Sequence, residues 1–421
     1  MNKKTVAIII GVVLVLIIVA LFVFQSPEAP APEDAGGNGV FPESSSLPEG
    51  TSGFGLPNLP GGESGTTSAS VDIESRFHKI TNAPVAGYVA LGSNEDLNLN
   101  LRYAEKETGH IFDYKAGGTV AERVTNTTIP RVQDVLWDKT GGKAIFRYFD
   151  GDENTVKTFV ASLVSSVSTS SGATTTETKL DGVFLPDNIT SLGYSTNTRI
   201  KNPIFYLTTS GSGATGYLTD FSGGKLTPIF NSSFSDWDVM WPNKLYLFTK
   251  PSGLMEGFVY TLNENLSSAT ETSLEKVLGG RLGLSPLPNK TGSLMLFSES
   301  KGATPELSLY KVAQKEISSL PLKTFAEKCA WGEKNEKIFY CAVPLSFPGG
   351  IYPDDWYKGK SQTSDGFVSY NIETGFFQIL AIMERDLGER VDVTDLVVAA
   401  DDSVLFFKNK LDQSLWSFSI K

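Results

Sequence analysis

Residues 5–24 form an unbroken apolar run, TVAIIIGVVLVLIIVALFVF, without a single charge. A helix of this length, rising about 1.5 Å per residue, would extend about 30 Å, the thickness of the hydrocarbon core of a bilayer. Basic residues precede the run and acidic residues follow it, namely Lys3 and Lys4 on one side and Glu28, Glu33 and Asp34 on the other. The positive-inside rule therefore predicts one transmembrane helix over residues 5–24, with residues 1–4 cytoplasmic and the rest outside the cytoplasmic membrane.

A cleaved signal peptide is the alternative to this signal anchor. Signal peptides have a shorter apolar core and a cleavage site of small residues. The candidate site, Ala29-Pro30-Ala31, is followed by Pro32, which we expect to disfavour cleavage. The sequence therefore favours a retained anchor.

Residues 25–75 lack the apolar positions that a packed core needs. Pro, Gly, Ser, Glu and Thr dominate them, as in SPEAPAPEDAGGNG and LPGGESGTTSAS. Such a segment cannot bury enough apolar surface to offset the entropy lost on ordering, so we predict a disordered linker. As a random coil of roughly 50 residues it would have an r.m.s. reach of about 40 Å.

From Arg76 onward, short apolar runs alternate with Gly, Asn, Asp, Ser and Pro, a pattern typical of an all-β protein. One type of strand recurs seven times, as NLRYAEK, IFRYFDG, IFYLTTS, LYLFTKP, LMLFSES, IFYCAVP and VLFFKNK, starting at residues 100, 145, 204, 245, 294, 338 and 404. Another short strand precedes each copy and a third follows it. The spacing of roughly 40 to 65 residues is close to the period of four-stranded propeller blades. We therefore predict a seven-bladed β-propeller over residues 76–421.

The end of the repeat predicts how the ring closes. Each of the first six units contains a fourth strand, whereas the seventh reaches Lys421 without one. A spare strand, RFHKIT, starts at Arg76, just before the first unit. Pairing of this N-terminal strand with the last blade would close the ring and remove an exposed edge.

In its general pattern the region from Arg76 to Lys421 resembles TolB-type and WD-repeat propellers. The resemblance rests on the blade rhythm and on turns such as YNIETG at Tyr370 and EKETGHIF at Glu105. The units do not each end in the Trp-Asp dipeptide that is typical of true WD repeats. The resemblance implies a fold and no single function, because propellers host many functions.

The formal net charge of -11 and the pI near 4.9 narrow the choice of partner. An acidic surface repels phosphate backbones, so we expect no nucleic-acid partner. A protein or a glycan of the cell envelope is the expected partner, in addition to the membrane itself through residues 5–24.

Cys329 and Cys341 are equidistant from Asn335 in the predicted hairpin CAWGEKNEKIFYC. This spacing places them on one face and directly opposite each other, within reach of a disulfide, which an oxidising compartment would permit. Two buried free thiols are the alternative. A zinc site is disfavoured because the two histidines, His78 and His110, fall in other units.

Unit six carries a long insert, PLSFPGGIYPDDWYKGKSQTSDG, between its second and third strands, followed by a long exit, MERDLGERVD. In a blade of antiparallel strands the 2–3 and 4–1 connections share one face, so both segments lie together. Aromatic and charged side chains in loops on a rigid scaffold are typical of recognition surfaces. The candidate binding residues are Tyr352, Asp354, Asp355, Trp356, Tyr357, Glu384, Arg385 and Asp386. The alternative is that the aromatic residues fold down to cap the blade.

Unit two is also long, between its third and fourth strands. The segment VSSVSTSSGATTTET has few apolar residues. We predict a solvent-exposed excursion without chemistry.

These observations favour a non-enzymatic binding or scaffolding module in the cell envelope. We expect no catalytic residues, cofactor or metal, because the chain has no phosphate-cradling glycine loop, HExxH or CxxC. The alternative is a carbohydrate-active enzyme that uses Asp354, Asp355 and Glu384 as acid and base. A third hypothesis is a structural spacer without a ligand.

Overall fold

The computed structural model describes residues 76–420, apart from short stretches at 93–99, 116–117, 119, 152–153, 171–172, 196, 198–199, 201–202, 225 and 263–272. The predicted transmembrane helix and linker, residues 5–24 and 25–75, lie outside the described residues. Within the described part of the chain, no helix has the length and apolar character needed to cross a membrane.

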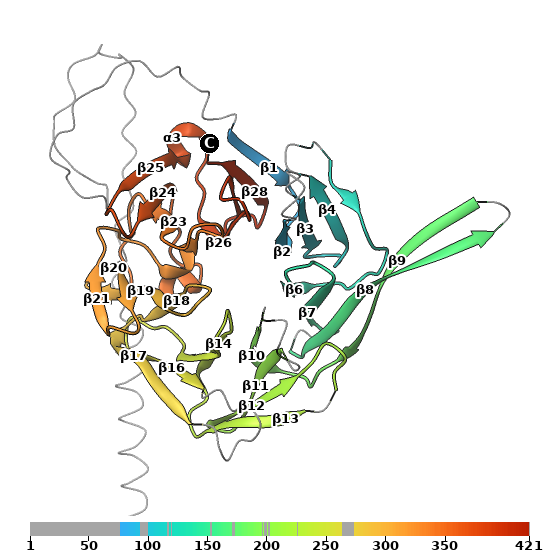
Figure 1. Cartoon of the computed structure of the whole chain (residues 1–421), viewed down its shortest axis with the longest axis horizontal. Helices are drawn as coiled ribbons and strands as arrows, with labels where there is room; N and C mark the ends of the chain where they lie inside the picture. The colour runs from blue at the N-terminus through green and yellow to red at the C-terminus, as the bar shows by residue number, and fades with distance from the viewer. Residues whose placement is uncertain are drawn as a thin grey trace, which may run out of the picture. The chain divides into compact units, whose positions relative to one another are not determined.

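Seven four-stranded antiparallel sheets are arranged around a common axis (Figure 1), which confirms the predicted all-β, seven-bladed propeller. The first strands of blades 1 to 7, nearest the axis, are β2 (Val85–Leu91), β6 (Val132–Trp137), β10 (Ile189–Tyr194), β14 (Trp237–Met240), β18 (Ser285–Pro288), β22 (Cys329–Trp331) and β26 (Val393–Val398). The second strands are β3 (Asn100–Glu105), β7 (Lys143–Phe149), β11 (Ile204–Ser210), β15 (Tyr246–Thr249), β19 (Leu294–Lys301), β23 (Ile338–Pro344) and β27 (Val404–Asn409). The third strands are β4 (Ile111–Lys115), β8 (Val156–Ser170), β12 (Gly213–Thr219), β16 (Glu256–Leu262), β20 (Thr304–Lys311), β24 (Asp365–Asn371) and β28 (Leu415–Ser419). The fourth strands are β5 (Glu122–Arg123), β9 (Ala173–Phe184), β13 (Thr227–Ser232), β17 (Leu274–Leu282), β21 (Glu316–Ser319), β25 (Phe377–Ile382) and β1 (Phe77–Thr81).

The N-terminal strand closes the ring. β1 pairs with β28, so blade 7 has the strand order β1-β28-β27-β26. Phe77 stands opposite Phe418 with ring centroids 4.6 Å apart. The Arg76 guanidinium donates hydrogen bonds to the backbone carbonyls of Ser419 and Ile420, both at 2.8 Å. The predicted closure is confirmed, and backbone pairing joins the two ends of the ring.

The core lies between neighbouring blades, where the faces of adjacent sheets pack together. Phe367 of blade 6 and Phe407 of blade 7, for example, belong to one buried cluster. Residues 204–207 of β11 are all buried, because the neighbouring blades cover both faces of this strand. At Gly87 a Cβ would lie 2.0 Å from the carbonyl oxygen of Val135, so glycine allows β2 to approach β6 closely.

The excursion predicted in blade 2 is a regular β-ribbon. β8 and β9 pair from Phe159↔Phe184 to Ser170↔Ala173 and project as a long hairpin (Figure 1). Val167 on this ribbon is 67% exposed, in agreement with the predicted exposure to solvent. The Thr and Val residues of the segment favour extended backbone, which explains why it is a pair of strands.

Three short helical turns lie in the connections near blade 6. They are η2 (Ala326–Lys328) before β22, α2 (Asp354–Tyr357) between β23 and β24, and α3 (Met383–Asp386) between β25 and β26. These are 4–1, 2–3 and 4–1 connections, so strand direction places all three on one face of the propeller. We call this face the insert face.

Candidate functional site

The aromatic residues of the blade 6 insert are mostly buried. Tyr352 and Trp356 are each 3% exposed and cluster with Phe325 and Phe347. The rings of Trp356 and Phe325 stack with centroids 4.7 Å apart. Tyr357, at 40% exposed, remains accessible. Much of the insert thus packs as a cap on the propeller, which is the alternative that the sequence left open.

The two aspartates of the insert accept hydrogen bonds that hold its backbone. Asp354 Oδ1 accepts a bond from Ser252 Oγ at 3.0 Å and Oδ2 accepts one from the Gly253 amide at 2.7 Å, which ties the insert to blade 4. Asp355 Oδ2 accepts a bond from the Ile351 amide at 2.8 Å. Both carboxylates therefore position the cap.

The remaining candidates, Glu384, Arg385 and Asp386, lie on α3. Asp386 Oδ2 accepts a hydrogen bond from the Ile382 amide at 2.7 Å, and Arg385 Nε donates to Asp386 Oδ1 at 2.6 Å. Burial alone would raise the pKa of Asp386, but these hydrogen bonds lower it. Within the described residues, no hydrogen bond or ion pair joins this group to residues 352–357. The two predicted groups share a face without forming one contact network.

A buried ion cluster beneath the insert was not predicted. Lys328 Nζ donates to Asp365 Oδ2 and Asp392 Oδ1, both at 2.6 Å, and to Thr363 Oγ1 at 3.0 Å. Trp356 Nε1 donates to Asp392 Oδ1 at 3.0 Å. The side chains of Lys328, Asp365 and Asp392 are 0% exposed, so each charge is balanced by its partners rather than by water. The cluster connects the insert to blades 6 and 7.

The two carboxyl groups of this cluster differ in their affinity for a proton. Burial raises the pKa of Asp365, the charge of Lys328 opposes this effect, and the charge of Asp392 adds to it. Burial alone would raise the pKa of Asp392. The charge of Lys328 and the hydrogen bonds that Asp392 accepts outweigh burial and lower this pKa. The cluster is spread over three distant stretches of sequence, EKCAW, TSDGF and RVDVTD, so no local pattern could have revealed it.

Cys329 and Cys341 are register partners in β22 and β23, as the hairpin spacing predicted. Their Sγ atoms lie 2.03 Å apart, the separation of a disulfide. Both residues are buried in the apolar core between blades 5 and 6.

Three first strands place an aspartate at the same position near the axis, namely Asp134, Asp238 and Asp395. Burial raises the pKa of Asp134, the charge of Asp395 adds to this, and Lys408 opposes it. Burial also raises the pKa of Asp238, which accepts a hydrogen bond from Ser191 Oγ at 2.8 Å. A recurring pattern, VQDVLW, DWDVMW and VTDLVV, could have revealed these axial carboxylates from sequence alone.

Glu327 of η2 joins the insert to this axial region. It accepts hydrogen bonds from Ser285 Oγ at 2.7 Å and from the Tyr357 hydroxyl. Burial raises the pKa of Glu327, the two hydrogen bonds oppose this effect, and the charges of Asp238 and Asp395 add to it. The hydrogen bond from Ser285, the first residue of β18, places Glu327 beside the first strand of blade 5. In the described part of the chain, no group of three or more His, Cys, Asp or Glu side chains is placed to hold a metal ion.

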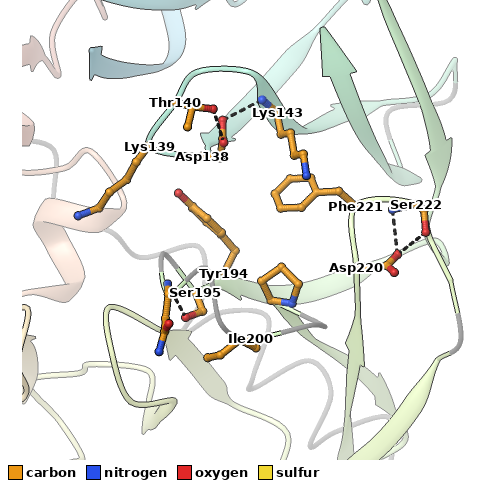
Figure 2. Close-up of a pocket in the computed structure, with 12 residues that line it drawn as sticks. Asp138, Lys139, Thr140, Lys143, Tyr194, Ser195, Ile200, Asp220, Phe221 and Ser222 are labelled. Atoms are coloured by element: carbon orange, nitrogen blue, oxygen red, sulfur yellow. Dashed lines mark hydrogen bonds between the residues drawn. The ribbon is translucent and has the colours of Figure 1, made fainter. Parts of the chain in front are cut away.

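A cavity of about 480 Å³ opens between blades 2 and 3 (Figure 2), and we call it the seam pocket. Its walls come from the β6–β7 turn, the β10–β11 connection and the β12–β13 turn. These are 1–2 and 3–4 connections, so the pocket lies on the face opposite the insert face. Its volume falls in the range of about 300 to 1,000 Å³ that is typical of small-molecule sites.

Two aromatic rings form the apolar walls of the seam pocket. The Tyr194 and Phe221 centroids lie 6.1 Å apart with an interplanar angle of 77°. In Figure 2 the Tyr194 ring points toward the turn of Asp138 and Lys139, and the Lys143 side chain runs beside the Phe221 ring. Burial and the charge of Asp138 raise the pKa of Tyr194, so its hydroxyl stays protonated at neutral pH.

The two aspartates of the pocket shape the turns that form its walls. Asp138 accepts hydrogen bonds from Thr140 Oγ1 at 2.6 Å and from the Lys143 amide at 2.8 Å. Asp220 Oδ1 accepts bonds from the Ser222 amide at 2.9 Å and from Ser222 Oγ at 2.6 Å. Each turn is ordinary in sequence. The pocket exists because the fold brings three turns together, so sequence analysis missed it.

Similar folds occur among solved structures. Neither a protein-family model nor a curated protein matches the chain. One similar solved structure is an oligogalacturonate lyase in complex with manganese, with 9% sequence identity, a TM-score of 0.48, and coverage of 82% of this chain and 90% of that one. Another is the β-propeller domain of the Trilobed protease from Pyrococcus furiosus, with 11% identity, a TM-score of 0.47, and coverage of 80% and 98%. At such identities the likeness concerns the fold alone.

The comparison overturns the prediction that the protein is not an enzyme. One of the similar structures is a lyase, so a fold of this type gives no ground for excluding catalysis. The prediction is therefore wrong. The TolB-type or WD-repeat resemblance stays a prediction.

Proposed function

We propose that the protein is a binding module of the cell envelope, anchored by residues 5–24, whose propeller lies outside the cytoplasmic membrane and holds a protein or glycan ligand. The seam pocket is the observation that carries this proposal, because it offers a cavity of ligand size with aromatic and polar walls. The blades supply a rigid scaffold for the turns that form it. The long linker, residues 25–75, would let the propeller reach a ligand away from the bilayer surface.

The insert face is the second surface for a partner. Tyr357 and Arg385 are accessible there, whereas Tyr352 and Trp356 are committed to packing. A partner on this face would therefore contact the rim of the cap. The seam pocket is favoured because it encloses a ligand on several sides.

The location can be tested with the full-length chain in membrane vesicles of known orientation. We expect external protease to degrade the propeller in right-side-out vesicles and to spare it in inside-out vesicles. Protection in right-side-out vesicles would contradict the proposed topology.

Binding can be tested by co-sedimentation of the full-length protein with insoluble envelope material. Phe221→Ala removes one wall of the seam pocket and should reduce co-sedimentation by about tenfold. Phe234→Ala is the matched control, because Phe234 is also partly exposed but lies in the connection between blades 3 and 4, on the insert face. Equal binding by the two variants and the wild type would refute the pocket as the binding site. Loss of binding in Tyr357→Ala alone would assign the partner to the insert face.

A further inference from the structure

The seam pocket combines aromatic surface with hydroxyl groups. Tyr194 lines the pocket from the end of β10 and Phe221 lines it from the β12–β13 turn. Among the lining residues, Thr140, Ser195 and Ser222 add aliphatic hydroxyls to the phenol of Tyr194. Thr140 and Ser222 donate their protons to Asp138 and Asp220, so their oxygens face a ligand as acceptors. A purely apolar ligand would cover these acceptors without a hydrogen bond, which is costly.

The charges that line the pocket balance. Asp138 and Asp220 contribute two negative charges, and Lys139 and Lys143 contribute two positive charges. The carboxylates are occupied in their own turns, as described above. Within the described residues, neither lysine forms an ion pair, and Lys143 Nζ lies 5.1 Å from the Phe221 ring centroid. The ammonium groups are therefore available as hydrogen-bond donors. Because the lining is neutral overall, a ligand needs no net charge to match it.

A neutral saccharide matches this combination. One face of a sugar ring carries C–H groups whose partial positive charge suits the negative face of an aromatic ring. Its hydroxyls both donate and accept, and the pocket offers donors on Lys139, Lys143 and Tyr194 beside hydroxyl and carboxylate acceptors. A strongly acidic ligand fits less well, because the chain carries a net charge of -11.

We propose that the seam pocket binds a neutral saccharide, with a sugar ring stacked on Tyr194 or Phe221 and its hydroxyls held by Lys139, Lys143 and the hydroxyl groups of the walls. This inference rests on the proposed binding function and gives its ligand a chemical class. A glycan of the envelope would then be recognised on the face opposite the insert.

Saturation-transfer NMR on the purified full-length protein tests the inference. The probes are tetrasaccharides of β-1,4-linked glucose and of N-acetylglucosamine, with a uronic acid tetramer as the charged comparison. A detergent without sugar groups is needed, so that micelles do not compete for the site. We expect transfer to the C–H protons of a neutral tetrasaccharide and an affinity at least about tenfold lower in Phe221→Ala and Tyr194→Ala. Phe234→Ala should bind like the wild type.

A milder variant keeps the test valid if Tyr194→Ala fails to fold. Lys139 is exposed on the β6–β7 turn, so Lys139→Gln leaves the core unchanged and should lower the affinity about threefold. Its control is Lys244→Gln, an exposed lysine in the equivalent turn of blade 4. Equal effects at Lys139 and Lys244 would overturn the inference.

The failure of this inference can be told apart from that of the proposed function. Folded protein that transfers saturation to no saccharide, or to the uronic acid tetramer only, overturns the neutral-saccharide inference. If Phe221→Ala still abolishes co-sedimentation with envelope material, the binding function stands with a ligand of another class. If Phe221→Ala and Tyr357→Ala both co-sediment like the wild type, the proposed function fails as well.

Discussion

The insert face at blade 6 and the seam pocket between blades 2 and 3 use similar side chains in opposite ways. At blade 6, aromatic rings are stacked inward and an ammonium is sealed between two carboxylates, with Trp356 at 3% exposed and Lys328 at 0%. At the seam, Lys139 and Lys143 stay in solvent while aspartates serve only their own turns. The difference lies in what surrounds each side chain rather than in its chemical type.

This contrast teaches that an insert rich in aromatic and charged residues need not be a recognition surface. A long connection between strands must satisfy its own backbone and cover its own apolar surface, and Asp354, Trp356 and Asp392 meet those needs at blade 6. At the seam, Asp138 and Asp220 satisfy the backbone of two short turns. The Phe221 ring and the exposed lysines beside these turns line an open cavity.

The largest expected effect comes from making the same substitution in both regions. Lys328→Met should lower the free energy of unfolding by about 3–5 kcal/mol, because it leaves the carboxylates of Asp365 and Asp392 buried without their cation. Lys143→Met should change it by about 0.5 kcal/mol or less, because that side chain is exposed. Urea unfolding of the two full-length variants measures both values. Similar small losses would mean that the buried cluster does not hold blade 6 together.

The repeat was predictable because its signals are local. Apolar runs at regular spacing define strands wherever they occur, and a missing fourth strand in the last unit calls for a donor such as the strand after Arg76. The pairing of Cys329 with Cys341 follows from hairpin symmetry in the same way. The strand and cysteine predictions depend on neighbours within one blade, whereas the closure prediction depends on the strand count of the whole repeat, because it pairs β1 with β28.

The sites were less predictable because they depend on contacts between distant segments. Sequence placed Trp356 in the correct connection, but its burial depends on Phe325 and Asp392, which belong to other connections. Tyr194 ends β10 and Phe221 follows β12, so their rings meet within blade 3 although 26 residues separate them. The pocket forms only when the β6–β7 turn of blade 2 lies beside them. The periodicity of the sequence predicts the strands and blades. It does not predict which loops of different strands contact each other.

The second-largest expected effect is the stability that a disulfide would contribute to blade 6, a covalent link for which the seam pocket has no counterpart among its lining residues. We expect Cys329 and Cys341 to form a disulfide in the mature protein, and a bridge with a sequence separation of 12 should contribute about 3 kcal/mol. Reduction should therefore lower the free energy of unfolding of the wild type and leave the Cys329→Ala/Cys341→Ala variant unchanged. Alkylation of both thiols in the unfolded, non-reduced protein would show that they are free and would remove this prediction.

A paired loss of one polar group should separate stability from binding. Trp356→Phe keeps a ring against Phe325 but removes the donor to Asp392, so it should cost about 1–3 kcal/mol of stability and leave saccharide affinity unchanged. Tyr194→Phe keeps the ring of the seam pocket and removes its hydroxyl, so it should weaken binding more than folding. Unfolding and saturation-transfer titrations on both variants supply the measurements. A loss of saccharide affinity in Trp356→Phe together with a loss of stability alone in Tyr194→Phe would contradict the contrast between the two regions.

The smallest effect is a pH dependence that belongs to the insert face. Asp365 has a raised pKa, so the folded protein holds its proton at pH values where the unfolded chain has released it. Its contribution to stability is complete below the usual value of about 3.9 and is lost as the pH rises through the raised pKa. Asp392 has a lowered pKa, so its contribution is present above about 3.9 and is lost as the pH falls through the lowered pKa.

Two variants separate the contributions of Asp365 and Asp392 to the dependence of unfolding free energy on pH. Asp365→Asn should reduce the decline in unfolding free energy above about pH 3.9, to which the raised pKa values of Asp134 and Asp238 also contribute. Asp392→Asn should reduce the decline below about pH 3.9, to which the lowered pKa of Asp386 also contributes. Each slope is limited to about 1.4 kcal/mol per pH unit for one proton. Unfolding from about pH 3 to about pH 7 measures both limbs. If both variants changed the stability over the same pH range, Asp365 and Asp392 would titrate as one coupled pair. That outcome would contradict the opposite pKa shifts that we expect from their different hydrogen bonds.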